Sequence, residues 1–166
     1  MGAAVLFAGL VISALPTQQT KAGEGTSLKP ELRATVQLRG TEPVLEVLIK
    51  NETAQSFWVN KRFAWNSESA PEWARELTIE IKDSSGQLAP YSCKMNIGLA
   101  GRTNYILLYP GEFVGRTISL KCAFLKRGAH YSIVARFRDS NTPQGLPPNI
   151  PVLHDELVSN TLELDY

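Results

Sequence analysis

The stretch RGAHYSIVARFRD, residues 127–139, alternates apolar and polar side chains along its central part. Successive side chains of a strand point to opposite faces of a sheet, so this alternation predicts a strand with one buried face. The same rhythm recurs elsewhere in the chain, and it decides the fold class. The side chains expected on the buried face are Tyr131, Ile133, Ala135 and Phe137.

Other segments repeat this period, and turn residues separate them. Helical periodicity is almost absent, so the sequence predicts an all-β, antiparallel β-sandwich of about 7–9 strands, with a barrel as the alternative. Strands are expected over residues 32–39, 44–51, 57–63 and 77–83, in two apolar runs around the turn at 109–111, and in a last segment where Val158, Leu162, Leu164 and Tyr166 share a face.

Residues 127–133 resemble one corner of the immunoglobulin-type β-sandwich. In that class a tyrosine near the start of the penultimate strand bonds back to upstream backbone, and Tyr131 has this position here. Ile133 stands where antibody domains carry a cysteine, so the antibody-type disulfide is not implied. The resemblance is to the broad immunoglobulin-like and fibronectin-like class of exported proteins. That class also includes small proteinase inhibitors and accessory domains of secreted hydrolases.

The composition limits the kinds of partner. A chain of 166 residues that is 43% hydrophobic and 20% charged is typical of one globular domain. Its 17 basic and 16 acidic residues leave a formal net charge of +1. Because this balance gives no long-range field to attract phosphate groups, we expect no nucleic-acid partner.

The N-terminal region differs from the rest of the chain. Residues 2–15 carry no charge, and they are too few for a membrane-spanning helix, which needs about 20. We expect a signal peptide over 1–22, a flexible tether over 23–30 and the sandwich domain over 31–166. No lysine or arginine precedes the apolar run, and a buried N-terminal helix is the alternative. Export to the periplasm or the extracellular space is expected, with no stable membrane anchor after leader cleavage.

The two cysteines, Cys93 and Cys122, lie in the predicted mature chain. In an oxidising compartment they could form one disulfide, and the alternative is a pair of buried free thiols. Their spacing excludes a CxxC redox or metal motif. The pattern around Cys122 places it on one face with Ile118, Leu120 and Phe124.

No catalytic motif is found in the sequence. It lacks a nucleophile elbow, a P-loop, a dinucleotide-binding glycine run and a zinc-binding HExxH pair. A small hydrolase would need His130 or His154, the only histidines, beside a serine or cysteine and a carboxylate. We therefore predict no catalytic residue, no metal site, no cofactor and no enzymatic activity.

All three tryptophans lie within residues 58–73, beside basic residues. Exposed rings there could stack on sugars or anchor a protein partner. The alternative is that Trp58 packs between the sheets while Trp65 and Trp73 cap one end of the core. The candidate binding surface consists of Trp58, Arg62, Trp65 and Trp73.

The sequence thus favours a non-enzymatic, exported binding module that contacts a protein partner through end loops, including residues 139–151. A proteinase-inhibitor role falls within this class by analogy of fold. The alternative function is a carbohydrate-binding accessory domain that uses Trp58, Trp65 and Trp73. Two exposed, roughly coplanar tryptophan rings would favour the carbohydrate-binding function.

Overall fold

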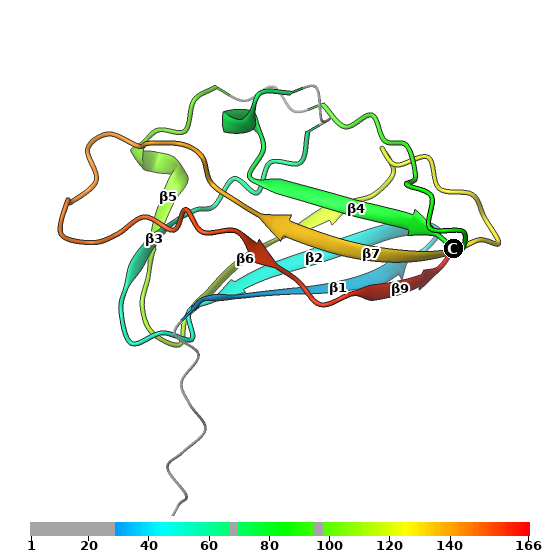
Figure 1. Ribbon diagram of the computed structural model, residues 1–166, viewed down its shortest axis with the longest axis horizontal. Helices are drawn as coiled ribbons and strands as arrows, with labels where there is room; N and C mark the ends of the chain where they lie inside the picture. Colours follow the sequence, from blue (N-terminus) through cyan, green and yellow to red (C-terminus); the bar gives the residue numbers. More distant parts are fainter. Residues whose placement is uncertain (1–28, 67–69, 95–97) are drawn as a thin grey trace, which may run out of the picture.

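The computed structural model describes residues 29–66, 70–94 and 98–166, and in these ranges the protein has nine strands and no α-helix (Figure 1). All pairings between these strands are antiparallel. The predicted all-β, antiparallel architecture is confirmed. The predicted signal peptide and most of the predicted tether lie outside the described residues.

The first sheet consists of β1 (Glu31–Arg39), β2 (Glu42–Lys50) and β6 (Phe113–Ser119), in the order β1-β2-β6. A tight turn joins β1 to β2, and Gly40 adopts φ 63° there, a conformation that favours glycine. β2 is the central strand of this sheet, with β1 at one edge and β6 at the other. The strand predicted over residues 44–51 is present, and three alternate side chains of it are fully buried: Leu45, Val47 and Ile49.

The second sheet is built around β7 (His130–Phe137). β4 (Leu77–Asp83) pairs with one edge of β7, and β8 (Leu157–Val158) and β9 (Leu162–Asp165) pair in succession with the other. The alternation that decided the fold class is confirmed. Its apolar face is 3% exposed or less at every position: Tyr131, Ile133, Ala135 and Phe137.

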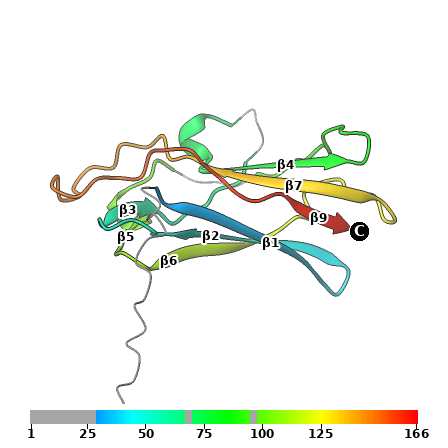
Figure 2. The same ribbon diagram turned by 60° about the horizontal axis from the view of Figure 1, so that its bottom comes forward.

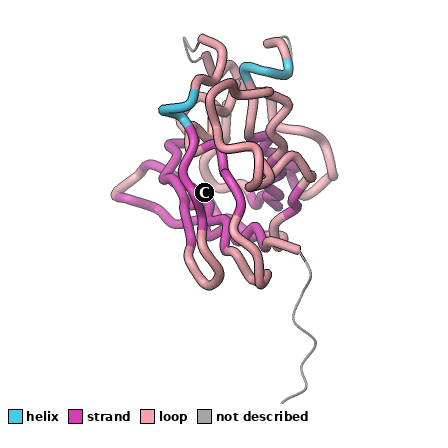
Figure 3. The backbone as a smooth tube through the Cα atoms, turned by 90° about the vertical axis from the view of Figure 1, so that its left-hand side faces the viewer, coloured by secondary structure: helices cyan, strands magenta, loops and turns pink. Residues whose placement is uncertain are grey.

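The two sheets form two layers, with β1, β2 and β6 in one and β4, β7 and β9 in the other (Figure 2). A small sheet of β3 (Phe57–Asn60) and β5 (Tyr105–Leu108) lies at one end (Figure 1). Figure 3 shows the backbone from the side of this end, with the strands joined by long loops. Two 3-10 turns, Glu72–Ala74 and Arg102–Asn104, lie in the connections. The largest fully buried apolar side chains come from all these parts: Phe63, Phe137, Leu45, Ile49, Leu77, Ile79, Ile81, Leu108, Leu120, Ile133 and Val47.

A buried amide joins the small sheet to the first sheet. Asn51 follows β2 directly and is fully buried. Its Nδ2 donates to the carbonyl oxygens of Leu108 at 3.1 Å and Gln55 at 2.8 Å, and its Oδ1 accepts from the Thr53 backbone N–H at 3.0 Å. These bonds fix the place where the chain leaves β2 for β3.

Two predicted strands have different bounds in the structure. The strand expected over 57–63 ends at Asn60, because the chain turns there and Phe63 adopts φ 45°, which is left-handed backbone. The last strand is broken between β8 and β9. Ser159 Oγ accepts from the Ala135 backbone N–H at 3.0 Å in this gap. Alternation therefore fails across it, and Val158 is 48% exposed.

The hydroxyl of Tyr131 makes the backbone bond that the resemblance implied. It accepts a hydrogen bond of 2.8 Å from the backbone N–H of Lys126, five residues upstream, and the tyrosine is only 3% exposed. Gly128, at φ 77°, lies in the intervening turn. The bond fixes the turn that enters β7.

Cys93 and Cys122 form a disulfide, with their Cα atoms 5.2 Å apart. The bridge links the segment after β4 to the segment after β6, and the Ser92 N–H donates to the Cys122 carbonyl at 2.9 Å beside it. β6 ends at Ser119, so the alternation predicted around Cys122 does not continue. Leu120 is fully buried but Phe124 is 62% exposed, so the two do not share a face as predicted. A disulfide is compatible with export. In the described ranges no helix is long and apolar enough to cross a membrane.

Removal of the Tyr131 hydroxyl should destabilise the protein. We expect Tyr131→Phe to lower the free energy of unfolding by about 1–2 kcal/mol, because the Lys126 N–H loses its acceptor. Denaturant unfolding measures the change, and Tyr109→Phe is the matched control because Tyr109 is 53% exposed. Equal midpoints for Tyr131→Phe and the wild type would show that the ring acts only by packing.

Loss of the disulfide should have a larger effect. The bridge closes a loop with a sequence separation of 29, for which chain entropy predicts a loss of about 3–4 kcal/mol on removal. The double variant Cys93→Ala, Cys122→Ala should unfold at the same denaturant concentration as the reduced wild type. A wild-type midpoint that does not respond to reductant would contradict this role.

Candidate functional site

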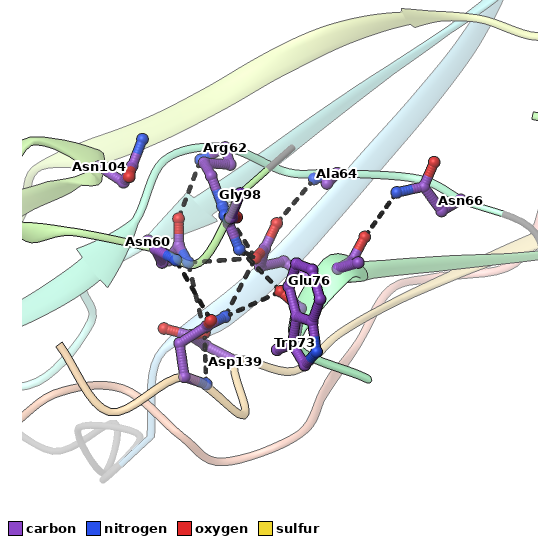
Figure 4. Close-up of polar contacts among 12 residues, drawn as sticks. Asn60, Arg62, Ala64, Asn66, Trp73, Glu76, Gly98, Asn104 and Asp139 are labelled. Atoms are coloured by element: carbon purple, nitrogen blue, oxygen red, sulfur yellow. Dashed lines mark hydrogen bonds and ion pairs between the residues drawn. The ribbon is translucent and has the colours of Figure 1, made fainter. Parts of the chain in front are cut away.

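Buried polar side chains gather at the end of the sheets where the small sheet lies (Figure 4). Four of them are 5% exposed or less: Asn60, Glu76, Asp139 and Asn141. Asn60 ends β3, and its register partner Tyr105 begins β5. We call this group the polar cluster, and its members are Asn60, Arg62, Glu76, Tyr105, Asp139 and Asn141.

The pairing of β4 with β7 brings the two carboxylates of the polar cluster to the same end. Leu77, the first residue of β4, is the register partner of Phe137, the last residue of β7. Glu76 directly precedes this pair in the chain, and Asp139 follows it by two residues. The Arg138 backbone N–H donates to the Glu76 carbonyl at 2.9 Å, which extends the ladder by one step.

Glu76 is the acceptor at the centre of the polar cluster. Its Oε1 accepts from Arg62 Nε at 3.0 Å, from Arg62 Nη2, from Asn60 Nδ2 at 3.2 Å and from Asn141 Nδ2 at 3.3 Å. Its Oε2 accepts from the Ala64 backbone N–H at 3.0 Å. The side chains of Arg62 and Glu76 are 9% and 0% exposed. They therefore form a buried ion pair, and further donors from within the fold complete it.

Asp139 is the second acceptor. Its Oδ2 accepts from the Tyr105 hydroxyl at 2.6 Å, and its Oδ1 accepts from Asn141 N at 3.1 Å, Asn141 Nδ2 at 2.8 Å and Asn60 Nδ2 at 3.3 Å. Burial raises the pKa of Tyr105, and the hydrogen bond to the Asp139 carboxylate raises it further. The hydroxyl thus stays protonated and serves as a donor.

The polar cluster also holds the backbone of two loops. Arg62 Nη1 donates to the Gly98 carbonyl at 2.6 Å, and Arg62 Nη2 donates to the Trp73 carbonyl at 2.9 Å. Asn141 Nδ2 donates to the same Trp73 carbonyl at 3.3 Å, and its Oδ1 accepts from the Ala100 N–H at 3.4 Å. The same two side chains therefore fix both loops.

Each of these loops exposes a large apolar side chain at the point where its backbone is held. Trp73 is 37% exposed and Leu99 is 74% exposed. The guanidinium of Arg62 donates to the carbonyl of Trp73 itself and to the carbonyl of Gly98, the residue before Leu99. The polar cluster thus presents two apolar side chains from fixed, neighbouring backbones.

The predicted tryptophan surface is not assembled as expected. Trp65 is 3% exposed, because its neighbour Ala64 pairs with the start of β4 and draws the ring into the core. Trp58 is half-buried, and Arg62 is turned inward to the polar cluster. Of the three tryptophans only Trp73 is exposed, so two exposed coplanar rings are not present among them.

The two histidines contact carboxylates and a carbonyl. His130 lies 2.7 Å from Asp165 and 3.0 Å from Glu163, and the hydrogen bond with Asp165 raises its pKa. His154 Nδ1 lies 2.8 Å from the Asp139 carbonyl oxygen. In the described part of the chain neither ring contacts a serine hydroxyl, and no three metal-ligating side chains of the His, Cys, Asp and Glu types lie close enough to hold an ion.

Most of the polar cluster was missed in the sequence. Glu76 directly precedes an apolar strand pattern and Asp139 follows another by two residues, and polar residues at strand ends are usually solvated turn residues. Glu76 and Asp139 lie close together because β4 pairs with β7. The sequence alone did not establish this pairing.

Comparison with known proteins finds no family model that matches the chain, and no curated protein that matches it.

Loss of the central charge should unfold the end of the molecule. We expect Glu76→Gln to lower the free energy of unfolding by about 3–5 kcal/mol, because the guanidinium of Arg62 would stay buried without its counter-charge. Glu80→Gln is the control, since Glu80 pairs with Arg136 and its side chain is 33% exposed. Its loss should stay within about 1 kcal/mol. Equal losses for the two variants would contradict a special role for the polar cluster.

Proposed function

We propose that this chain is an exported, non-enzymatic binding module of the immunoglobulin-like β-sandwich class, which contacts another protein through loops at one end of its sheets. The observation that carries this proposal is the exposure of Trp73 and Leu99 on loops whose backbones are fixed from below by Arg62 and Asn141.

Fixed loops with apolar tips suit protein recognition. Tryptophan is among the residue types that contribute most binding energy at protein interfaces. Immobilising a side chain on binding costs about 0.5–1.5 kcal/mol, and less has to be immobilised when the backbone beneath it is already held. A large apolar side chain that is 74% exposed, such as Leu99, gains by being covered.

The reactive groups of the site favour binding over catalysis. The carboxylates of Glu76 and Asp139 are each in residues only 1% exposed, and both accept several hydrogen bonds from the fold. A substrate would have to displace these donors to reach either group. Both cysteines are joined in the disulfide and offer no free thiol.

Site-specific photocrosslinking in the native cells tests the proposal. A photoreactive amino acid at Leu99 or at Trp73 should give one discrete protein adduct in the cell envelope or the medium. The control position is Leu38, which is 46% exposed and lies beside the turn from β1 to β2, at the end of β2 opposite to Asn51 and the small sheet. Adducts of equal yield at all three positions, or none at Leu99 and Trp73, would contradict the proposal.

A further inference from the structure

One edge of the first sheet is open. β6 pairs with β2 on one side, and in the described ranges no strand pairs with its other side. The Leu120 N–H donates to the Pro43 carbonyl at 2.9 Å, and the Asn51 N–H donates to the Glu112 carbonyl at 2.9 Å. These two bonds lie just beyond the two ends of β6, and they show which residues of β6 form hydrogen bonds with β2.

The same pattern identifies the backbone groups at the open edge. In an antiparallel pair, hydrogen-bonded and non-hydrogen-bonded residue pairs alternate along the strands. Even-numbered residues of β6 therefore bond to β2, and odd-numbered residues point their N–H and C=O groups away from it. From Gly115 to the end of β6, the residues whose backbone faces the open edge are Gly115, Thr117 and Ser119.

A pocket of about 450 Å³ opens beside this edge. Its lining includes the core residues Phe63 and Trp65, both half-cystines of the disulfide and Ile118 of β6. The pocket therefore has an apolar interior next to a strand with free hydrogen-bonding groups.

The same pocket is lined by positive charge. Lys94, Arg116 and Lys121 line it, and none of the aspartates and glutamates that the structure describes does. Arg116 points to the core side of β6, since its register partner is the fully buried Val47, and its Nη1 donates to the Arg62 carbonyl. Within the described ranges none of the three cations forms an ion pair with a carboxylate.

We propose that β6 and this pocket bind an extended, acidic segment of a partner protein as an additional strand of the first sheet. The main chain of the segment would bond to Gly115, Thr117 and Ser119, as in recognition by strand addition. An apolar side chain of the segment would enter the pocket, and its carboxylates would meet the three cations. Neither Trp73 nor Leu99 lines this pocket, and the proposal does not depend on the function proposed for the end loops.

Charge also selects between this partner and a second copy of the chain. Pairing of two β6 edges would bring Arg116 and Lys121 of each copy close to those of the other. Like charges at facing positions destabilise a pair of strands, and inward-pointing charge on an edge strand prevents edge-to-edge association. An acidic segment gains from the same charges.

Amide hydrogen exchange with a defined peptide tests the proposal. The probe is a peptide of about eight residues in which glutamate alternates with valine, long enough for one strand. At saturation we expect exchange of the Thr117 and Ser119 amides to slow by about tenfold or more, while those of Arg116 and Ile118, already bonded to β2, change little. Protection of both sets alike, or of neither, would overturn the proposal.

Substitutions supply an independent readout of affinity. The double variant Lys94→Glu, Lys121→Glu should raise the Kd of the peptide by about tenfold or more. The control Arg39→Glu, Arg127→Glu changes the net charge equally at exposed positions away from the pocket and should leave the Kd within about twofold. Equal changes in the two variants would show binding by net charge alone and would overturn the site.

The backbone contribution has its own variant. Thr117→Pro removes an N–H group from the open edge without removing a bond to β2, and proline is tolerated at such edge positions. It should weaken peptide binding, and an unchanged Kd in the folded variant would contradict strand addition.

Protection of Thr117 and Ser119 that appears without peptide and grows with protein concentration would instead identify a second copy as the occupant. Loss of the crosslinks at Leu99 would leave all these results unaffected.

Discussion

The buried ion pair of Arg62 and Glu76 is the interaction on which the site end of the molecule depends. A charge taken out of water is tolerated only where a partner and further hydrogen bonds replace its hydration. Glu76 finds its donors on Asn60, Arg62, Ala64 and Asn141, so the buried charge joins three separate parts of the chain: residues 60–64, Glu76 itself and Asn141. The end loops therefore have to adopt one arrangement together for the pair to be buried.

The two ends of β7 are fixed by different means. At its start, the hydroxyl of Tyr131 accepts from the Lys126 N–H and holds the entering turn. At its other end, Asp139 accepts from the Tyr105 hydroxyl and from Asn141, and it joins the loops to the small sheet. The apolar core between the layers stabilises the strands, while polar contacts determine where the loops lie.

The alternation of apolar residues was enough to predict most of the strands, the buried face of β7 and the all-β class, but not the ends of β3 or the break between β8 and β9. The local sequence could also predict that Tyr131 bonds to upstream backbone, since the Lys126 N–H that donates to its hydroxyl is only five residues away. The polar cluster could not be predicted in this way, because its bonds join residues up to 79 positions apart. Trp65 shows the same limit: its burial follows from the pairing of Ala64 with the start of β4, and nothing in the residues around it indicates that contact.

Backbone order in the loops tests the central claim most directly, namely that the polar cluster holds them in one conformation. The measurement is the set of ¹⁵N relaxation order parameters for the amides of Trp73, Leu99, Ala100 and Asn141. If the polar cluster holds these loops, the values should be about 0.85, equal to those of the strands. Values below about 0.6 at these positions, with rigid strands beside them, would contradict it.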